Sequence, residues 1–276
     1  MRPFHFAAAV STAALCLSAG WVASAWADEP KAIVKGVDDK ALRQLLEKAV
    51  GTTKAVPKSR FEARRRAREA GDQVVAVLRS EGYYGYEVAP DIGEGDAPLA
   101  YITITPGPIF RIQDPRIAWI GAPPVPDALT AGEAAMALKP GGPGRAAEVV
   151  SAEGRIVGAV EKHGYADAAA DPREVIVDHA DNSVRPTFNI RAGELVRLDG
   201  LKIEKHGRTR IGWLRALQPW KPGDVYSTDA VGELERRLLD TGVYESVTVS
   251  LAPKGQEVDG RRPVIVSLSD RPRGTL

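Results

Sequence analysis

The clearest pattern in this chain is a stripe of apolar residues with helical spacing, and it occurs three times. Steps of three and four residues place such a stripe on one face of a helix. The stripes consist of Ala67, Ala70, Val74, Val77 and Leu78, then Val149, Ala152, Ile156 and Val160, then Val231, Leu234 and Leu238. A glycine follows each stripe, at positions 82, 164 and 242. Because glycine reaches positive φ without a Cβ penalty, each one suits a left-handed helix cap.

Strand patterns flank each predicted helix. Tyr84, Tyr86 and Val88 alternate after the first glycine, and residues 243–249 are rich in β-branched side chains. A shorter helix comes before the long one, with Asp38 and Asp39 as the cap of the first. The remaining predicted elements are strands at 101–105, 110–112, 187–190, 195–201 and 264–268 and short helices at 41–50 and 209–217. Each segment therefore reads strand–helix–helix–strand–strand.

Short motifs repeat with nearly one period. Lys139-Pro140-Gly141-Gly142 returns as Lys221-Pro222-Gly223-Asp224, 82 positions later. The three glycines that end the long helices are 82 and then 78 positions apart. We therefore predict an α+β chain of three tandem modules, each with two helices on one face of a three-stranded mixed sheet. The predicted modules span 28–107, 108–193 and 194–272, with short joints that favour a semi-rigid curved rod.

The N-terminal segment has the pattern of a secretory signal peptide. Arg2 precedes an apolar run from Phe6 to Trp26, and Ala25 and Ala27 supply the small residues of a cleavage site. Residues 1–27 are the predicted signal, and the only cysteine, Cys16, lies inside it. The alternative, an uncleaved anchor of about 20 residues, stays open. Either way the sequence predicts an exported chain.

Composition excludes several classes of protein. The chain of 276 residues has 37 Lys and Arg against 36 Asp and Glu, so its net charge gives no reason to expect a nucleic-acid binder. One cysteine excludes a disulfide framework and a multi-cysteine metal site. With 44% apolar residues the chain can build packed cores.

The sequence contains no recognisable catalytic constellation. The histidines are scattered without metal-ligand spacing. There is no Gly-x-Ser-x-Gly elbow. The run Gly141-Gly142-Pro143-Gly144 lacks the Lys-Ser/Thr of a phosphate loop, and we interpret it as a helix-entry turn. We predict no catalytic, cofactor-binding or metal-binding residue, and no enzyme.

One basic run is conspicuous. Arg60, Arg64, Arg65 and Arg68, with Arg66 among them, are relieved only by Glu62 and Glu69. Such a run contacts either anionic lipid headgroups or an acidic partner, or it is simply the solvated face of a helix. We favour the solvated face.

The repeat resembles the polypeptide-transport-associated (POTRA) domain. The stretch Gly242-Val243-Tyr244-Glu245-Ser246-Val247-Thr248-Val249, behind residues 221–227, is similar to the POTRA pattern in which a helix-cap glycine leads into the second strand. Three such units after a signal peptide resemble TamA-type outer-membrane assembly factors of the BamA-like superfamily. The resemblance implies a C-terminal barrel, and residues 273–276 look like the start of a linker to this absent domain.

Sheet edges are the predicted binding sites. If the second strand of each module lies outermost, its unpaired backbone groups can accept an extended peptide as an added strand. The predicted edges lie near 83–90, 165–178 and 243–250. The candidate binding residues are Tyr84, Tyr86, Val88, Tyr165, Val175, Val177, Tyr244, Val247 and Val249.

The resemblance also implies partners and a location. These are unfolded outer-membrane protein or autotransporter clients, a TamB-like partner that bridges the envelope, and the periplasm of a Gram-negative cell. Two alternatives remain at this point. One is the POTRA arm of a two-partner secretion transporter, and the other is a periplasmic enzyme with a site between modules.

Overall fold

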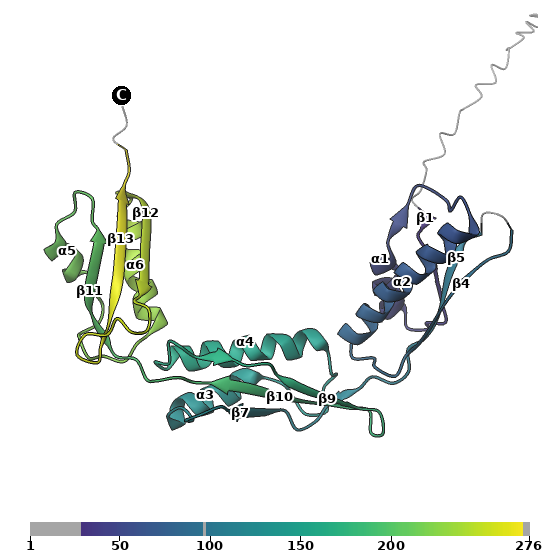
Figure 1. Cartoon of the computed structure of the whole chain (residues 1–276), viewed down its shortest axis with the longest axis horizontal. Helices are drawn as coiled ribbons and strands as arrows, with labels where there is room; N and C mark the ends of the chain where they lie inside the picture. Colours follow the sequence, from purple (N-terminus) through teal and green to yellow (C-terminus); the bar gives the residue numbers. More distant parts are fainter. Residues whose placement is uncertain (1–28, 96–97, 273–276) are drawn as a thin grey trace, which may run out of the picture.

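Three mixed sheets, each covered by two helices, follow one another along the chain (Figure 1). In this computed structural model, residues 29–95 and 98–272 are described. The predicted signal peptide at 1–27, its cleavage site at Ala25 and Ala27, and the predicted linker at 273–276 lie outside the described residues.

The first unit has strand order β2-β5-β4. The short strand β2 is parallel to the central strand β5, and β4 is antiparallel to it. The first unit also contains a two-stranded antiparallel ribbon formed by β1 and β3. The elements are β1 (Glu29–Pro30), β2 (Ile33–Lys35), α1 (Lys40–Val50), β3 (Thr52–Thr53), α2 (Arg60–Ser80), β4 (Glu87–Ile92) and β5 (Ala100–Thr105).

The second unit is built around one long central strand, β10. Its first strand is divided into β6 and β7, both parallel to β10, and β8 and β9 pair antiparallel on the other side. The gap between β6 and β7 lies beside Pro186 of β10, which has no N–H to donate at that point. The elements are β6 (Arg111–Ile112), β7 (Arg116–Trp119), α3 (Pro126–Met136), α4 (Ala146–Lys162), β8 (Ala169–Ala170), β9 (Glu174–Asp178) and β10 (Ser183–Arg191).

The third unit has strand order β11-β13-β12. Strand β11 is parallel to the central β13, and β12 is antiparallel to it. The elements are β11 (Leu198–Lys205), α5 (Ile211–Ala216), α6 (Thr228–Asp240), β12 (Tyr244–Leu251) and β13 (Arg262–Asp270).

The predicted helical stripes form the cores. All of their residues are buried except Val77, which is partly buried against the first core. Asp39 caps α1, because its carboxylate accepts hydrogen bonds from the N–H groups of Ala41 and Leu42 at 2.8 and 2.9 Å. The three glycines adopt φ of +92°, +99° and +67°. The strand–helix–helix–strand–strand order and the α+β fold class are confirmed.

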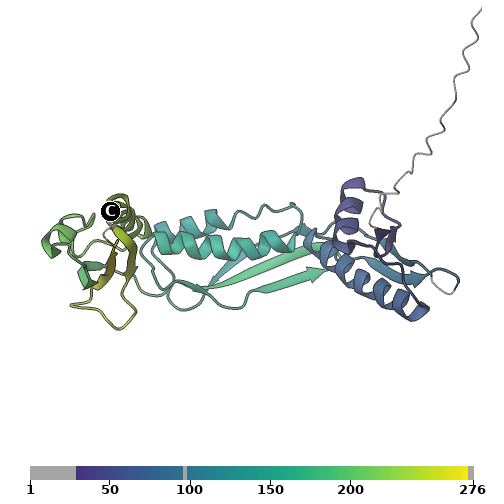
Figure 2. The same ribbon diagram turned by 90° about the horizontal axis from the view of Figure 1, so that it is seen from above.

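The three units form an open, bent arc (Figures 1 and 2). The middle unit lies lengthwise, and the first and third units rise from its two ends on the same side in Figure 1. Their cores are separate clusters, one or two for each unit. The predicted module boundaries at 107/108 and 193/194 remain a prediction.

Candidate functional site

The outer edge of the third sheet exposes unpaired backbone groups. In an antiparallel pair, residues alternate between those that bond the partner strand and those whose N–H and C=O point away from it. Ala252 N–H donates to Pro263 C=O at 2.9 Å, and the β12–β13 register then assigns Thr248 and Ser250 to the inward set. The backbone groups of Val247, Val249 and Leu251 therefore point outward. Among the described residues, no group bonds to them.

The same geometry holds at the edge of the second sheet. The N–H of Gln113 donates to Val184 C=O, so the backbone groups of Val184 point toward β6. The backbone groups of the odd-numbered residues of β10 therefore point toward β9. The register then leaves Val175 and Val177 with outward backbone groups. In the described part of the chain these groups have no hydrogen-bond partner. Strand β9 is consequently a second open edge.

The edge of the first sheet is largely closed. Gly93 N–H donates to Leu99 C=O at 2.9 Å, and this places Val88, Pro90 and Ile92 in the outward set of β4. Pro90 has no N–H, and Ile92 N–H already donates to Asp91 Oδ1 at 2.7 Å. Proline and an occupied donor are two of the ways in which proteins protect sheet edges from added strands. Val88 alone keeps an outward donor.

The opposite edges of the second and third sheets are partly occupied by the glycine turns that open the long helices. Ile112 N–H donates to Gly142 C=O, and Gly141 N–H donates to Ile112 C=O, both at 2.8 Å. The third unit repeats this pattern, since Leu198 N–H donates to Asp224 C=O at 2.8 Å and Gly223 N–H to Leu198 C=O at 2.7 Å. Added strands therefore find more accessible backbone on the β9 and β12 sides.

Five of the nine predicted edge residues lie on edge strands with outward backbone groups. These are Val88, Val175, Val177, Val247 and Val249. They belong to three different sheets, so the fold does not bring them together into one site. A sixth, Tyr244, begins β12, but its side chain is buried and its hydroxyl lies 2.7 Å from Thr209 Oγ1. Tyr244 is thus a core residue.

The other three predicted residues lie outside the strands, and for these the strand prediction is wrong. Strand β4 begins only at Glu87, so Tyr84 and Tyr86 precede it, and Tyr165 precedes β8. Tyr165 is buried, and its hydroxyl accepts the N–H of Val125 at 2.8 Å. Tyr86 is stacked beside Arg79, which donates to its hydroxyl at 3.0 Å.

Tyr84 joins two units. It leaves the first core and packs edge-on against Phe110 of the second, with ring centroids 5.5 Å apart. Its hydroxyl donates to Gly144 C=O at 3.0 Å, and burial raises the pKa of the phenol. Tyr83 and Tyr86 instead pack against the first core. The alternation of Tyr84, Tyr86 and Val88 predicted that Tyr84 and Tyr86 lie on the same face of one strand. This prediction is wrong, because β4 begins only at Glu87 and the two tyrosines pack against different cores.

Both joints between units use the same backbone contacts, which the sequence analysis missed. Gly82 C=O accepts the N–H of Phe110 at 2.8 Å, and Gly164 C=O accepts the N–H of Val196 at 2.9 Å. The glycines are required by close approach as well as by positive φ. A Cβ on Gly164 would clash with Val225 Cγ1. The repeated glycine pattern was the available signal for these joints.

Ion pairs reinforce the two joints to different extents. Arg262, only 5% exposed, donates two hydrogen bonds to Asp167 at 2.9 and 2.6 Å. These hydrogen bonds hold the pKa of Asp167 below its ordinary value. At the first joint, Arg145 Nε lies 3.1 Å from Glu81 Oε2, and this arginine is far more exposed than Arg262. The second joint therefore carries the stronger charge-assisted contact.

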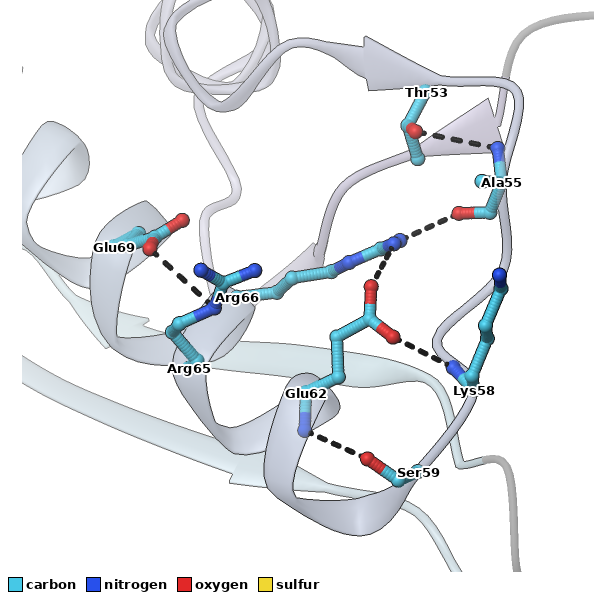
Figure 3. Close-up of polar contacts among 8 residues, drawn as sticks. All are labelled: Thr53, Ala55, Lys58, Ser59, Glu62, Arg65, Arg66 and Glu69. Carbon is cyan, nitrogen blue, oxygen red and sulfur yellow. Dashed lines mark hydrogen bonds and ion pairs between the residues drawn. The ribbon is translucent and has the colours of Figure 1, made fainter.

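The predicted basic residues lie in the N-terminal part of α2. Ser59 accepts the N–H of Glu62 at 3.2 Å, and the Glu62 carboxylate accepts the N–H of Lys58 at 2.9 Å, which is a capping arrangement (Figure 3). Arg66 turns toward the preceding loop, where it donates to Ala55 C=O and to Glu62, both at 2.6 Å. The N–H of Lys58 and then Arg66 lower the pKa of Glu62. Arg66 is structural, whereas Arg60, Arg64, Arg65 and Arg68 are exposed.

Among residues 29–95 and 98–272, no group of three or more His, Cys, Asp or Glu side chains is placed to hold a metal ion. Within the same residues, none of the helices has the length and apolar character needed to span a membrane.

The fold is that of POTRA domains. A crystal structure of POTRA domains 3–5 of BamA from Haemophilus influenzae matches with a TM-score of 0.52 at 17% identity, covering 88% of this chain and 96% of that one. BamA from Haemophilus ducreyi lacking POTRA domains 1–3 gives 0.49 at 24% identity, covering 59% and 30%. The N-terminal domain of Omp85 from Thermosynechococcus elongatus gives 0.38 at 18% identity, covering 90% and 98%.

The first of these likenesses confirms the POTRA resemblance at the level of fold. No protein-family model matches the sequence, and no curated protein matches it either.

Proposed function

We propose that the chain is a periplasmic scaffold arm of an outer-membrane protein assembly or secretion factor. It binds extended segments of unfolded outer-membrane protein clients as added strands, and it does so without catalysis. The single observation that carries this proposal is the row of outward N–H and C=O groups at Val247, Val249 and Leu251, with a second row at Val175 and Val177. Backbone pairing tolerates varied client sequences, as an assembly factor requires.

The joints support a scaffold role. Each joint combines a close glycine contact with backbone hydrogen bonds. Because β9 and β12 belong to one connected chain, they can bind two segments of the same client. Binding of the first segment then raises the effective concentration of the second segment at its own edge. The chain also shares its fold with POTRA domains 3–5 of BamA from Haemophilus influenzae.

We make three more specific proposals that rest only on the resemblance to TamA-type assembly factors. The chain is the arm of a TamA-type factor, its clients include autotransporters, and it docks a TamB-like partner from the inner membrane side of the periplasm. In this arrangement the arm is associated with the outer membrane. The modules are those predicted from the sequence, 28–107, 108–193 and 194–272.

Proline substitution tests strand addition directly. Val249→Pro removes an outward N–H and leaves the β12–β13 ladder intact, so we expect at least fivefold weaker binding of a urea-denatured outer-membrane protein after dilution. Val249→Thr keeps the N–H and a β-branched side chain, and it is the matched control with unchanged binding. Val177→Pro and Val177→Thr form the same pair on β9. The readout is fluorescence anisotropy of the labelled client.

Hydrogen exchange gives an independent readout. The amide of Val249 exchanges quickly in the free chain because it faces solvent, whereas the amide of Thr248 is protected by the ladder. Client binding by strand addition slows exchange at Val249 and leaves Thr248 unchanged. Equal client affinity in Val249→Pro and wild type, with no new protection on β9 or β12, would rule out strand addition.

A further inference from the structure

A groove runs between α2 and β4 of the first unit. It consists of two adjoining hollows of about 250 and 350 Å³ that share Arg68 and Pro90 as lining residues. One end is lined by Arg60 and Arg64 together with Arg68. The other end is lined by Val75, Tyr86 and Val88. The groove is thus basic at one end and largely apolar at the other.

Helical geometry brings the arginines into this groove. Arg60, Arg64 and Arg68 are spaced four residues apart, so they follow one side of α2 toward the strand. Gly71 continues the same side, and a Cβ there would lie 3.1 Å from Pro90 Cγ. The glycine therefore lets β4 approach the helix and form the opposite wall of the groove.

The positive charge at the basic end is poorly neutralised. Among residues 29–95 and 98–272, Arg64 and Arg68 form no ion pair, and Arg60 donates to Gly95 C=O at 3.1 Å. Asp91 also lines this end, but its carboxylate already accepts the N–H of Ile92. Asp72 lines the groove beyond Arg68. Three guanidinium groups line the groove together with the carboxylates of Asp91 and Asp72, so positive charge is in excess and favours an anionic ligand.

Helix α2 extends further at its N-terminus than its counterparts do. It has 21 residues, whereas α4 has 17 and α6 has 13. All three helices end two residues before their cap glycines, so the residues that α2 has beyond α4 are 60–63, and these include Arg60. Arg64 and Arg68 align with Ala146 and Val150 of α4, so the basic side of α2 is particular to the first unit in its residue types as well as in its length.

We propose that this groove binds an extended acidic peptide segment followed by apolar residues. The arginines bind its carboxylates, and Val75, Val88 and Tyr86 contact its apolar side chains. Side chains hold the ligand, because Pro90 and the Asp91–Ile92 hydrogen bond deny it a strand partner on β4. The span from Arg60 to Val75 is about 22 Å, which matches six or seven extended residues.

A peptide fits this site better than a lipid surface does. The arginines line a hollow that β4 bounds on its other side, and a flat membrane surface cannot enter such a hollow. The proposal stands independently of strand addition at β9 and β12. The first unit recognises its ligand through side chains, whereas β9 and β12 pair with the backbone of a client.

The test uses the full chain and a fluorescein-labelled octapeptide with three glutamates at one end and three valines at the other. Arg64→Glu with Arg68→Glu is expected to weaken binding at least tenfold. The matched control, Arg65→Glu with Arg236→Glu, makes the same charge change on exposed arginines outside the groove and is expected to stay within twofold. A peptide with lysines in place of the glutamates does not bind, and binding to wild type weakens as salt rises.

Three results would overturn the proposal. The first is equal weakening by both arginine pairs, which would indicate a general charge effect. The second is absence of peptide binding, with or without sedimentation of the chain on phosphatidylglycerol vesicles that depends on Arg64 and Arg68. The third is loss of peptide binding in Val249→Pro, which would assign the peptide to β12. Should the double variant fail to fold, the lysine peptide and the salt dependence of wild type decide the question.

Discussion

At the scale of single residues, glycine and tyrosine determine how one unit meets the next. Gly82 and Gly164 combine positive φ with carbonyl groups that receive the following unit, and Tyr84 crosses from one core to the next. These positions tolerate little change because backbone and side chains approach them closely. A Cβ at Gly164 would meet Leu195 Cδ1 at 2.7 Å as well as Val225.

Gly164→Ala tests this demand. The positive φ and the clash together are expected to destabilise the second joint by about 2 kcal/mol or more. The matched control is Gly158→Ala in α4, where a Cβ meets nothing within 4 Å. The control removes a helix-interior glycine and is expected to stabilise the chain by about 0.5–1 kcal/mol. Thermal unfolding of both variants checks the opposite signs, and a matching gain for both would contradict the role of the joint.

At the scale of elements, the same strand–helix–helix–strand–strand order carries three different edges. Strand β4 is blunted by Pro90, β9 is open at Val175 and Val177, and β12 is open over a longer stretch. The difference arises from which residues face outward, not from strand propensity. Proline is tolerated in β4 because its position requires no ladder N–H.

The alternation on β12 predicts an unusual order of stability. Thr248→Pro removes an N–H that bonds β13, whereas Val249→Pro removes one that faces solvent. We expect Thr248→Pro to cost about 1–3 kcal/mol more, since it leaves a ladder carbonyl without its donor. This order holds although Thr248 is exposed and Val249 packs against the core. Urea unfolding of the two variants decides it, and the reverse order would mean that the outward set is misassigned.

At the scale of the whole molecule, the arc depends on two joints of unequal strength. Asp167 and Arg262 are 95 positions apart and tie the second unit to the third. The exposed Arg145–Glu81 pair at the first joint is worth at most about 1 kcal/mol. The joint between the second and third units should therefore respond more strongly to changes in charge.

The pH dependence of the second joint follows from the lowered pKa of Asp167. A depressed carboxyl pKa stabilises the joint above the ordinary Asp value, near 4, and this contribution is lost as pH falls through the lowered pKa. Small-angle scattering should show an unchanged maximum dimension between pH 7 and pH 5 and a looser arc only below about pH 4. Asp167→Asn should be loose already at pH 7, whereas Asp171→Asn, in an exposed pair with Arg191, should not. A tight arc in Asp167→Asn at pH 7 would contradict this role.

Local periodicity was enough to predict most of the fold. The three apolar stripes, the cap glycines and the cap at Asp39 follow from interactions between residues a few positions apart, and the structure confirms each of them. The repeat then predicted the order of elements. Within the candidate site, the valines of β9 and β12 were predicted because β-branched residues mark strands.

The sequence by itself thus determined the helices, their caps and the α+β order of elements. Only the tertiary structure decided which backbone groups face outward, since strand register sets this through pairing with residues far along the chain. It also decided that Tyr84 joins two units, that Asp167 meets Arg262, and that the arginines of α2 line a groove against β4. Each of these contacts joins segments distant in sequence, and periodicity along one segment carries no information about its partner.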